Sequence, residues 1–262
     1  MEDSFPAADD KDRNFVTALA RGLDVLRCFR RGEPELTNTD FAERTGLPKA
    51  TVSRLTHTLC KLDYLVANPR TGTYRLGSGV LQLGFGVLAG MEMTDRAADE
   101  MRALCTGPNS YLTVALGERH RFDVVYVAVH RSHEDVSLSM HVGSHLPLFF
   151  SAIGRAILVG SQEDERAALI EAADRQDPER KSERMASLAR AMSDYESLGF
   201  CTGYGEWRPD VNGIAVPVTS AGGGRVYGLN VGGPSFHVKK RQLETVYAKR
   251  LIHAADALSL TP

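Results

Sequence analysis

Cysteine is scarce in this sequence, and its placement does not indicate a structural framework. The 262 residues include four cysteines that lie far apart and show no paired spacing: Cys28, Cys60, Cys105 and Cys201. This spacing matches neither a disulfide framework nor a zinc ribbon. We therefore expect free thiols and a reducing compartment, the cytoplasm.

Long hydrophobic runs are also missing. The uncharged, apolar stretch of residues 76–91 is too short and too rich in glycine to span a membrane. The first residues are acidic and lack the apolar segment of a signal peptide. We expect residues 1–14 to form a disordered tail, and we expect no membrane partner.

No complete set of catalytic or metal-binding residues is visible. His130 with His133, and His141 with His145, have spacings that could suggest a metal, but no cysteine or acid cluster completes four ligands. Cys201 could be a nucleophile, but spacing identifies no base beside it, so a buried thiol is the default interpretation. The sequence therefore predicts no metal, no cofactor and no enzyme.

Charge is distributed unevenly along the chain. The net charge is −2, yet residues 44–75 hold six basic residues and one acid, whereas residues 91–262 hold 19 basic and 22 acidic residues. One basic segment on a neutral-to-acidic body indicates a localised contact with a polyanion.

The basic segment lies within a pattern of three helices and two short strands. Apolar spacing predicts a helix over residues 15–30, a short helix over 38–44 with Thr37 and Asp40 as a capping box, and a third helix from Pro48 to Leu62. Residues 64–67 and 73–76 are predicted strands joined by a turn. This order is typical of a winged helix-turn-helix, here residues 15–77.

The third helix has two unlike faces. Val52, Leu55, Leu59 and Leu62 share an apolar face, and the opposite face carries small polar and basic groups without an acid. A helix of this length can lie in the major groove, where the fork of Arg54 suits a guanine edge. The predicted DNA-binding residues are Thr37, Lys49, Ala50, Thr51, Ser53, Arg54 and His57, with Arg70, Thr71, Tyr74 and Arg75 on the wing. The alternative is a solvated helical face beside a small core.

The remainder is predicted to be a linker helix and an α+β domain. Residues 78–92 are apolar almost all round, which favours burial against another subunit. Residues 93–262 begin with a helix over 94–105. They alternate predicted strands (111–116, 124–129, 136–140, 213–219, 225–232) with helices over 154–159 and 162–173, one ending at Gly199 and one closing the chain. The second of these helices has Ser161 and Asp164 as a predicted capping box. An antiparallel sheet with flanking helices is the expected architecture.

Several long motifs resemble one family. TGLPKATVSRLTHTLCKLDYLVANPRTGTYRLGSGVLQLG, HVGSHLPLFFSAIGRAIL, YESLGFCTGYGEWRPDVNGIAVPV and GLNVGGP together resemble IclR-family regulators over nearly the whole chain. The resemblance implies a regulator with a GAF-like effector-binding domain, assembled as a homodimer or homotetramer, that binds a small organic ligand.

The resemblance also implies where the ligand lies. Its carboxylate would meet the backbone amides of Ala152 and Ile153, beside Ser151 and Gly154, and a helix N-terminus suits an anion. The other predicted effector-binding residues are Leu138, Met140, Gly203, Tyr204, Trp207, Gly213, Asn230 and Gly232. Glyoxylate-binding members have an acid at the position of Gly203 and serines at those of Asn230 and Gly232. Less polarity and nearby aromatic residues favour a larger, aromatic acid. Tight packing of small residues, with Trp207 in the core, is the alternative.

The sequence thus predicts a ligand-responsive transcriptional regulator, of a catabolic operon, that binds a palindromic double-stranded operator and senses a small organic acid. Two alternatives stay open. One is a DNA-binding head fused to an enzyme acting on a small acid, and the other is an oligomeric DNA-architectural protein.

Overall fold

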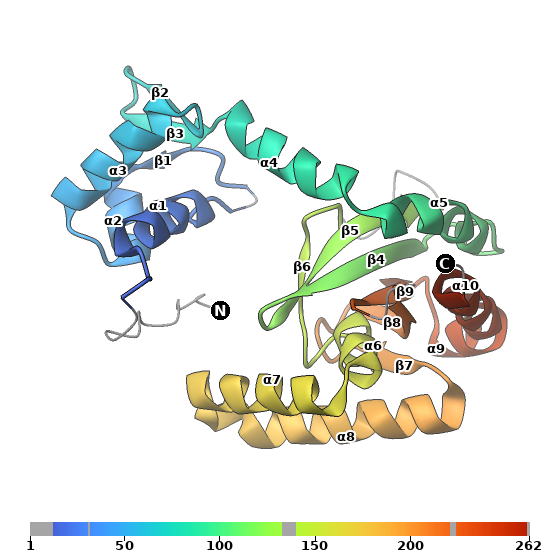
Figure 1. Ribbon diagram of the computed structural model, residues 1–262. Helices are drawn as coiled ribbons and strands as arrows, with labels where there is room; N and C mark the ends of the chain where they lie inside the picture. The colour runs from blue at the N-terminus through green and yellow to red at the C-terminus, as the bar shows by residue number, and fades with distance from the viewer. Residues whose placement is uncertain (1–12, 31, 133–139, 221–223, 261–262) are drawn as a thin grey trace. The chain divides into compact units, whose positions relative to one another are not determined.

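The computed structural model describes residues 13–30, 32–132, 140–220 and 224–260. They form two compact units, of which the first ends at Gly90 and the second begins at Met91 (Figure 1). Each unit has its own hydrophobic core.

The first unit is a winged helix-turn-helix, as the sequence predicts. Its helices are α1 (Thr17–Arg27), α2 (Asn38–Thr45), α3 (Lys49–Lys61) and α4 (Ser78–Ala89). Strands β1 (Leu36–Thr37), β2 (Leu65–Asn68) and β3 (Thr73–Leu76) form an antiparallel sheet in the order β1-β3-β2. The predictions missed β1, because two residues are too few to show a strand pattern.

Local signals set the helix-turn-helix. The Thr37 hydroxyl accepts the Asp40 N–H and the Asp40 carboxylate accepts the Thr37 N–H at 2.7 Å, which is the predicted capping box. Gly46 ends α2 with φ +68°, a left-handed conformation that glycine adopts without strain. Phe41 is fully buried, 5.6 Å from Phe29 between ring centroids. Capping and one aromatic anchor therefore fix the position of α2.

Two details of the helices differ from the predictions. α1 is shorter than residues 15–30, and Leu19 and Leu23 on it are 64% and 44% exposed rather than buried. Leu62 follows the end of α3 and is 57% exposed, so the apolar face of α3 consists of Val52, Leu55 and Leu59.

The second unit is built on one six-stranded antiparallel sheet. In chain order it contains α5 (Glu92–Cys105), β4 (Thr113–His120), β5 (Asp123–Arg131), β6 (His145–Pro147), α6 (Ala152–Gly160), α7 (Glu163–Gln176) and α8 (Lys181–Leu198), then β7 (Cys201–Tyr204), β8 (Val211–Thr219), β9 (Val226–Pro234), the short α9 (Lys240–Gln242) and α10 (Ala248–Leu260). The strand order is β6-β5-β4-β9-β8-β7. The α+β class is confirmed.

Helices cover both faces of this sheet. α6 packs on β8 and β9 and against α8, while α5 and α10 pack against each other and against β4, β5 and β8 (Figure 1). Alternation along the strands separates the two faces. Ala115 in β4 and Ala215 in β8 belong to the cluster that contains α6. Their immediate neighbours in each strand therefore point to the other face.

Three local predictions for this unit need comment. β6 and β7 were not predicted, since both are short. The predicted capping box of Ser161 and Asp164 is wrong: α7 starts at Glu163, and the Ser161 hydroxyl instead donates to the Ile157 carbonyl at the end of α6. The predicted strand over residues 136–140 lies, except for Met140, outside the described residues.

Candidate functional site

The exposed face of α3 is the first candidate site. Lys49, Ala50, Ser53, Arg54 and His57 are all exposed. Among the described residues, no hydrogen bond or ion pair engages the guanidinium of Arg54. The face therefore presents free hydrogen-bond donors and no carboxylate. Such a face suits contacts with the base edges and the phosphates of DNA.

The wing has an exposed tip and an inward-facing aromatic residue. Arg70, Thr71 and Arg75 are exposed. Tyr74, in contrast, packs against the core with its ring 6.0 Å from that of Phe41, and its hydroxyl accepts a hydrogen bond from Asn38. The Tyr74 side chain thus holds the wing onto α2.

Three further polar residues of the first unit face the fold at least in part. The side chain of Thr37 caps α2, and Thr51 is half-buried. Arg44 turns inward, where it donates to the Cys28 carbonyl at 2.8 Å and lies 2.9 Å from the Glu33 carboxylate. The charge that faces solvent on this unit is therefore smaller than the net charge of the segment indicates.

The second candidate site is a cavity at the N-terminus of α6. Ser151 caps this helix: its hydroxyl accepts the Gly154 N–H at 3.2 Å and donates to the Pro147 carbonyl at 2.7 Å. The geometry of a first helical turn leaves the amides of Ala152 and Ile153 without an intrahelical acceptor. Both residues line the cavity, and the free N–H groups and the dipole at a helix N-terminus favour a carboxylate.

A row of three glycines lies across the floor of this cavity. Gly203 in β7 pairs with Gly213 in β8, which pairs with Gly232 in β9. Thr113 in β4 pairs with Gly232 and continues the row. Because paired residues of antiparallel strands point to the same face, the row leaves a strip of bare backbone. A flat group can lie on such a strip.

The row begins at the helix terminus. A Cβ atom added to Gly203 would lie 2.9 Å from the Ala152 nitrogen, so glycine at this position keeps that amide accessible. Gly154 is equally constrained, because a Cβ there would lie 2.0 Å from the Leu148 carbonyl oxygen. Small residues therefore fix both the approach to the amides and the seating of α6.

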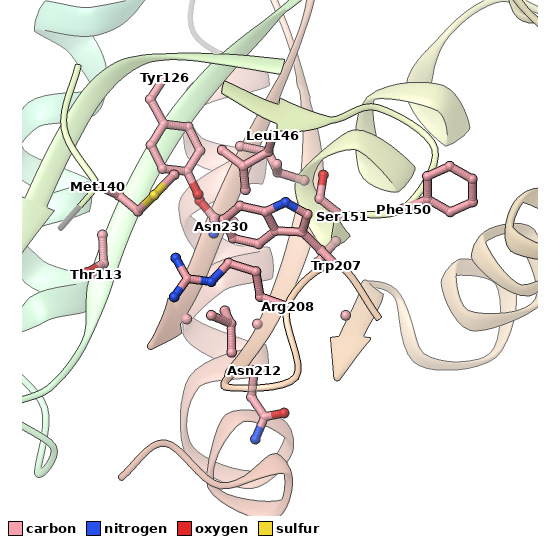
Figure 2. Close-up of a pocket in the computed structure, with 16 residues that line it drawn as sticks. Thr113, Tyr126, Met140, Leu146, Phe150, Ser151, Trp207, Arg208, Asn212 and Asn230 are labelled. Carbon is pink, nitrogen blue, oxygen red and sulfur yellow. The ribbon is translucent and has the colours of Figure 1, made fainter. Parts of the chain in front are cut away.

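The indole of Trp207 lies in the middle of the cavity. Figure 2 shows it reaching into the space between Ser151 on one side and Tyr126 on the other. The space left is about 40 Å³, which holds a few water molecules. A ring-sized ligand can bind only when this indole moves.

The comparisons with known proteins decide the family. Residues 18–69 match the profile described as the IclR helix-turn-helix domain, and residues 85–260 match that described as the bacterial transcriptional regulator IclR C-terminal domain. The chain belongs to the IclR family.

Individual IclR-family relatives agree. The chain is 37% identical over 222 residues to the HTH-type transcriptional regulator TsaQ1/TsaQ2 of Comamonas testosteroni, covering 84% of this chain and 79% of that protein. An IclR-family transcriptional regulator from Brucella abortus has 40% identity and a TM-score of 0.85, covering 98% of this chain and 97% of that one. An IclR homologue of Microbacterium hydrocarbonoxydans, complexed with 4-hydroxybenzoate, shares the fold at 22% identity and a TM-score of 0.69, covering 92% and 97%.

This IclR-family protein is therefore a DNA-binding transcriptional regulator, with DNA as its partner and the IclR C-terminal domain as its second unit. Among the described residues, no helix is long and apolar enough to cross a membrane.

Most residues predicted for the effector site of this IclR-family protein do line one cavity: Met140, Ser151, Ala152, Ile153, Gly203, Trp207, Gly213, Asn230 and Gly232. Gly154 is not among the residues that line it. Tyr204 does not line the cavity; its hydroxyl donates to Glu244 at 2.8 Å. Leu138 lies outside the described residues.

Phe150, one of the aromatic residues expected near the site, also lines the cavity, whereas the sequence did not indicate the other lining residues: Thr113, Tyr126, Leu146, Arg208, Val211 and Asn212. Thr113 carried a weak signal, because it is a polar residue in a strand of otherwise apolar residues. Arg208 sits on the loop between β7 and β8 and forms two contacts with Asp210, at 3.1 and 2.7 Å. The Asp210 carboxylate therefore balances the charge of this guanidinium.

Polar contacts hold the loop that carries Trp207. Glu206 lies 3.9 Å from the buried guanidinium of Arg155 and also pairs with Arg190. Arg155 in turn donates to the Thr202 carbonyl at 2.7 Å and to the Ser187 hydroxyl at 2.9 Å. Burial lowers the pKa of Arg155, and the charge of Glu206 opposes this change. Since Arg155 is on α6, the loop and the anion-binding helix share one polar network.

The residues considered for other chemistry do not assemble. Burial raises the pKa of the Cys201 thiol to about 12, and the charge of Asp194 adds to this, so the thiol is a poor nucleophile. In the described part of the chain, no three His, Cys, Asp or Glu side chains gather closely enough to hold a metal ion. His133 lies outside that part, and His145 lies 3.9 Å from Asp123.

Proposed function

We propose that this protein is a ligand-responsive regulator that binds a two-fold symmetric operator as a homodimer or a dimer of dimers, and that it senses a small aromatic acid. The observation that carries the DNA-binding half is the exposed, acid-free face of α3. Lys49, Ser53, Arg54 and His57 reach base edges in the major groove, while Arg70, Thr71 and Arg75 of the wing hold the backbone.

Two exposed apolar surfaces of the first unit support self-association. On α1 and just before it, Phe15, Val16, Leu19 and Leu23 are exposed. On α4, Leu81, Leu83, Phe85 and Val87 are between 57% and 75% exposed. Exposed apolar side chains on these two helices favour burial against another chain, and a second copy of this protein is the partner that a two-fold operator requires.

The cavity of the second unit supports an acid as effector. Its carboxylate binds the amides of Ala152 and Ile153, and its ring lies on the glycine row in the space that Trp207 now occupies. A homologue of the same fold binds 4-hydroxybenzoate, a ligand of this class. Because Arg155 joins α6 to the Trp207 loop, occupancy favours one arrangement of that loop. This differential binding is what a ligand-driven switch needs.

Two measurements test the proposal. An operator selected from random DNA is titrated with the protein in a gel-shift assay, and Arg54→Ala should lose the preference for it. Calorimetry with benzoate and its ring-substituted relatives should then detect binding, and the bound acid should change operator affinity. Equal operator affinity of wild type and Arg54→Ala contradicts the DNA-binding face, and absence of heat with every acid contradicts the effector site.

A further inference from the structure

Two buried polar atoms of the cavity wall are left without a partner. In the described part of the chain, neither the Thr113 hydroxyl nor the side-chain carbonyl of Asn230 makes a hydrogen bond. Thr113 is 3% exposed and Asn230 is 9% exposed. A buried polar atom that has lost water without gaining a partner destabilises the fold. We therefore expect these two atoms to form hydrogen bonds with a polar group of the ligand.

The two atoms lie at the end of the cavity away from the helix terminus. Gly203 lies against the Ala152 amide, and the row then passes through Gly213 and Gly232 to Thr113. Three inter-strand spacings of roughly 4.8 Å make about 14 Å. That length accommodates one aromatic ring with a polar group, and a hydrogen bond of about 2.8 Å, at each end.

Asn230 stands next to this end of the row. It lies two residues from Gly232 in β9 and is therefore a diagonal neighbour of Thr113 across the β4–β9 pair. Figure 2 shows Thr113, Asn230 and Tyr126 together on one side of the cavity, with Ser151 on the other. The buried atom of Asn230 without a partner is its side-chain carbonyl oxygen, which is therefore an open acceptor.

A hydroxyl group satisfies both atoms at once. It donates its proton to the Asn230 carbonyl, and it accepts the Thr113 hydroxyl proton on its own oxygen. A methyl group, a halogen or a hydrogen at that position satisfies neither requirement. A second carboxylate has no proton for the carbonyl of Asn230 and places a charge among buried side chains.

We propose that the effector is a flat acid with a hydroxyl group opposite its carboxylate, and that Asn230 and Thr113 select it by binding that hydroxyl. This inference rests on the proposed effector site and adds the second recognition point. It assigns a specificity role to two residues on different strands.

The probes are 4-hydroxybenzoate, benzoate and 4-fluorobenzoate, titrated into the full-length protein by calorimetry. The fluoro compound is a control of similar size that has no proton to donate. We expect 4-hydroxybenzoate to bind at least tenfold more tightly than either control, which corresponds to about 1.4 kcal/mol.

Variants with side chains of nearly the same size then test which residues cause the preference for 4-hydroxybenzoate. Thr113→Val and Asn230→Leu should each reduce the ratio of 4-hydroxybenzoate affinity to benzoate affinity to less than threefold. Asn230→Ser, which keeps a polar group in less volume, should retain part of the preference and serves where Asn230→Leu folds poorly. Thermal unfolding followed by circular dichroism verifies that each variant is folded.

The outcomes separate the two proposals. Equal binding of all three acids overturns the hydroxyl selection and leaves the effector site standing, because water then satisfies the two atoms. A tenfold preference that survives undiminished in the folded Thr113→Val and Asn230→Ser variants also overturns it. Absence of binding by every acid overturns this inference and the proposed effector site together.

Discussion

Replacing Arg54 by alanine is the sharpest test of how this protein contacts DNA. Arg54 lies on the exposed face of α3, and among the described residues nothing engages its guanidinium. Its removal should therefore leave the free energy of unfolding within about 0.5 kcal/mol of wild type. The whole effect should appear in DNA binding.

The size of that effect follows from the proposed two-fold assembly. One bidentate contact between arginine and guanine discriminates by about 1–3 kcal/mol. A dimer loses two such contacts, so specific binding should weaken by about 2–6 kcal/mol, which is roughly 30-fold to 20,000-fold. Binding to random DNA should change much less, because phosphate contacts dominate it.

Arg44 provides a matched control on the neighbouring helix. Its guanidinium donates to the Cys28 carbonyl and pairs with Glu33, so it is part of the fold. Arg44→Ala should lower the free energy of unfolding by about 1 kcal/mol and leave the salt dependence of DNA binding unchanged. The assay is a gel-shift titration of operator and random duplexes at several salt concentrations, together with thermal unfolding. Equal weakening on operator and random DNA by Arg54→Ala would refute the assignment of base reading to this residue.

Further predictions concern the wing, the cavity and the helix cap. Arg75→Ala should reduce the salt slope of binding by about 0.9 per protomer, or about 1.8 for a dimer; an unchanged slope removes this residue from the phosphate contacts. Trp207 is the one tryptophan of the sequence, so tryptophan emission should shift as 4-hydroxybenzoate displaces the indole; calorimetric binding without any shift contradicts the displacement. Gly213→Val should abolish acid binding, because its side chain covers the glycine row. The fold should stay intact, because an added Cβ meets its nearest atom at 3.5 Å; unchanged acid affinity contradicts the role of the glycine row. Hydrogen bonds from Thr37 hold the pKa of Asp40 below its usual 3.8, so this carboxylate stabilises the fold above that pH and the contribution is lost as pH falls through the lowered value. Asp40→Asn should therefore lower Tm near neutral pH and have a Tm closer to that of wild type in acid. A difference in Tm that is the same at both pH values would show that the charge of Asp40 does not contribute to stability.

The DNA-binding unit could be predicted from the sequence because its signals are local. The spacing of Val52, Leu55 and Leu59 defines one face of α3, and the acid-free opposite face follows from the same helical period. The capping box of Thr37 and Asp40 is a contact within one helical turn. What the sequence could not reveal there is the inward turn of Arg44 and of Tyr74, since both depend on distant partners.

The effector cavity was decided by tertiary structure. Gly203, Gly213, Gly232 and Thr113 form one row only because β7, β8, β9 and β4 pair in that register. No local pattern specifies the register of strands that are far apart in the chain. Resemblance to a family placed several of these residues near a ligand, but it could not show that Trp207 lies in the middle of the cavity.

The amino-acid sequence by itself therefore determined the helices, the wing and the basic face, because neighbours in the chain set them through period, capping and turn chemistry. The tertiary structure decided which charges remain free, which glycines meet and which polar atoms are buried without a partner. These properties arise from contacts between residues that only the packing of the sheet and its helices brings together.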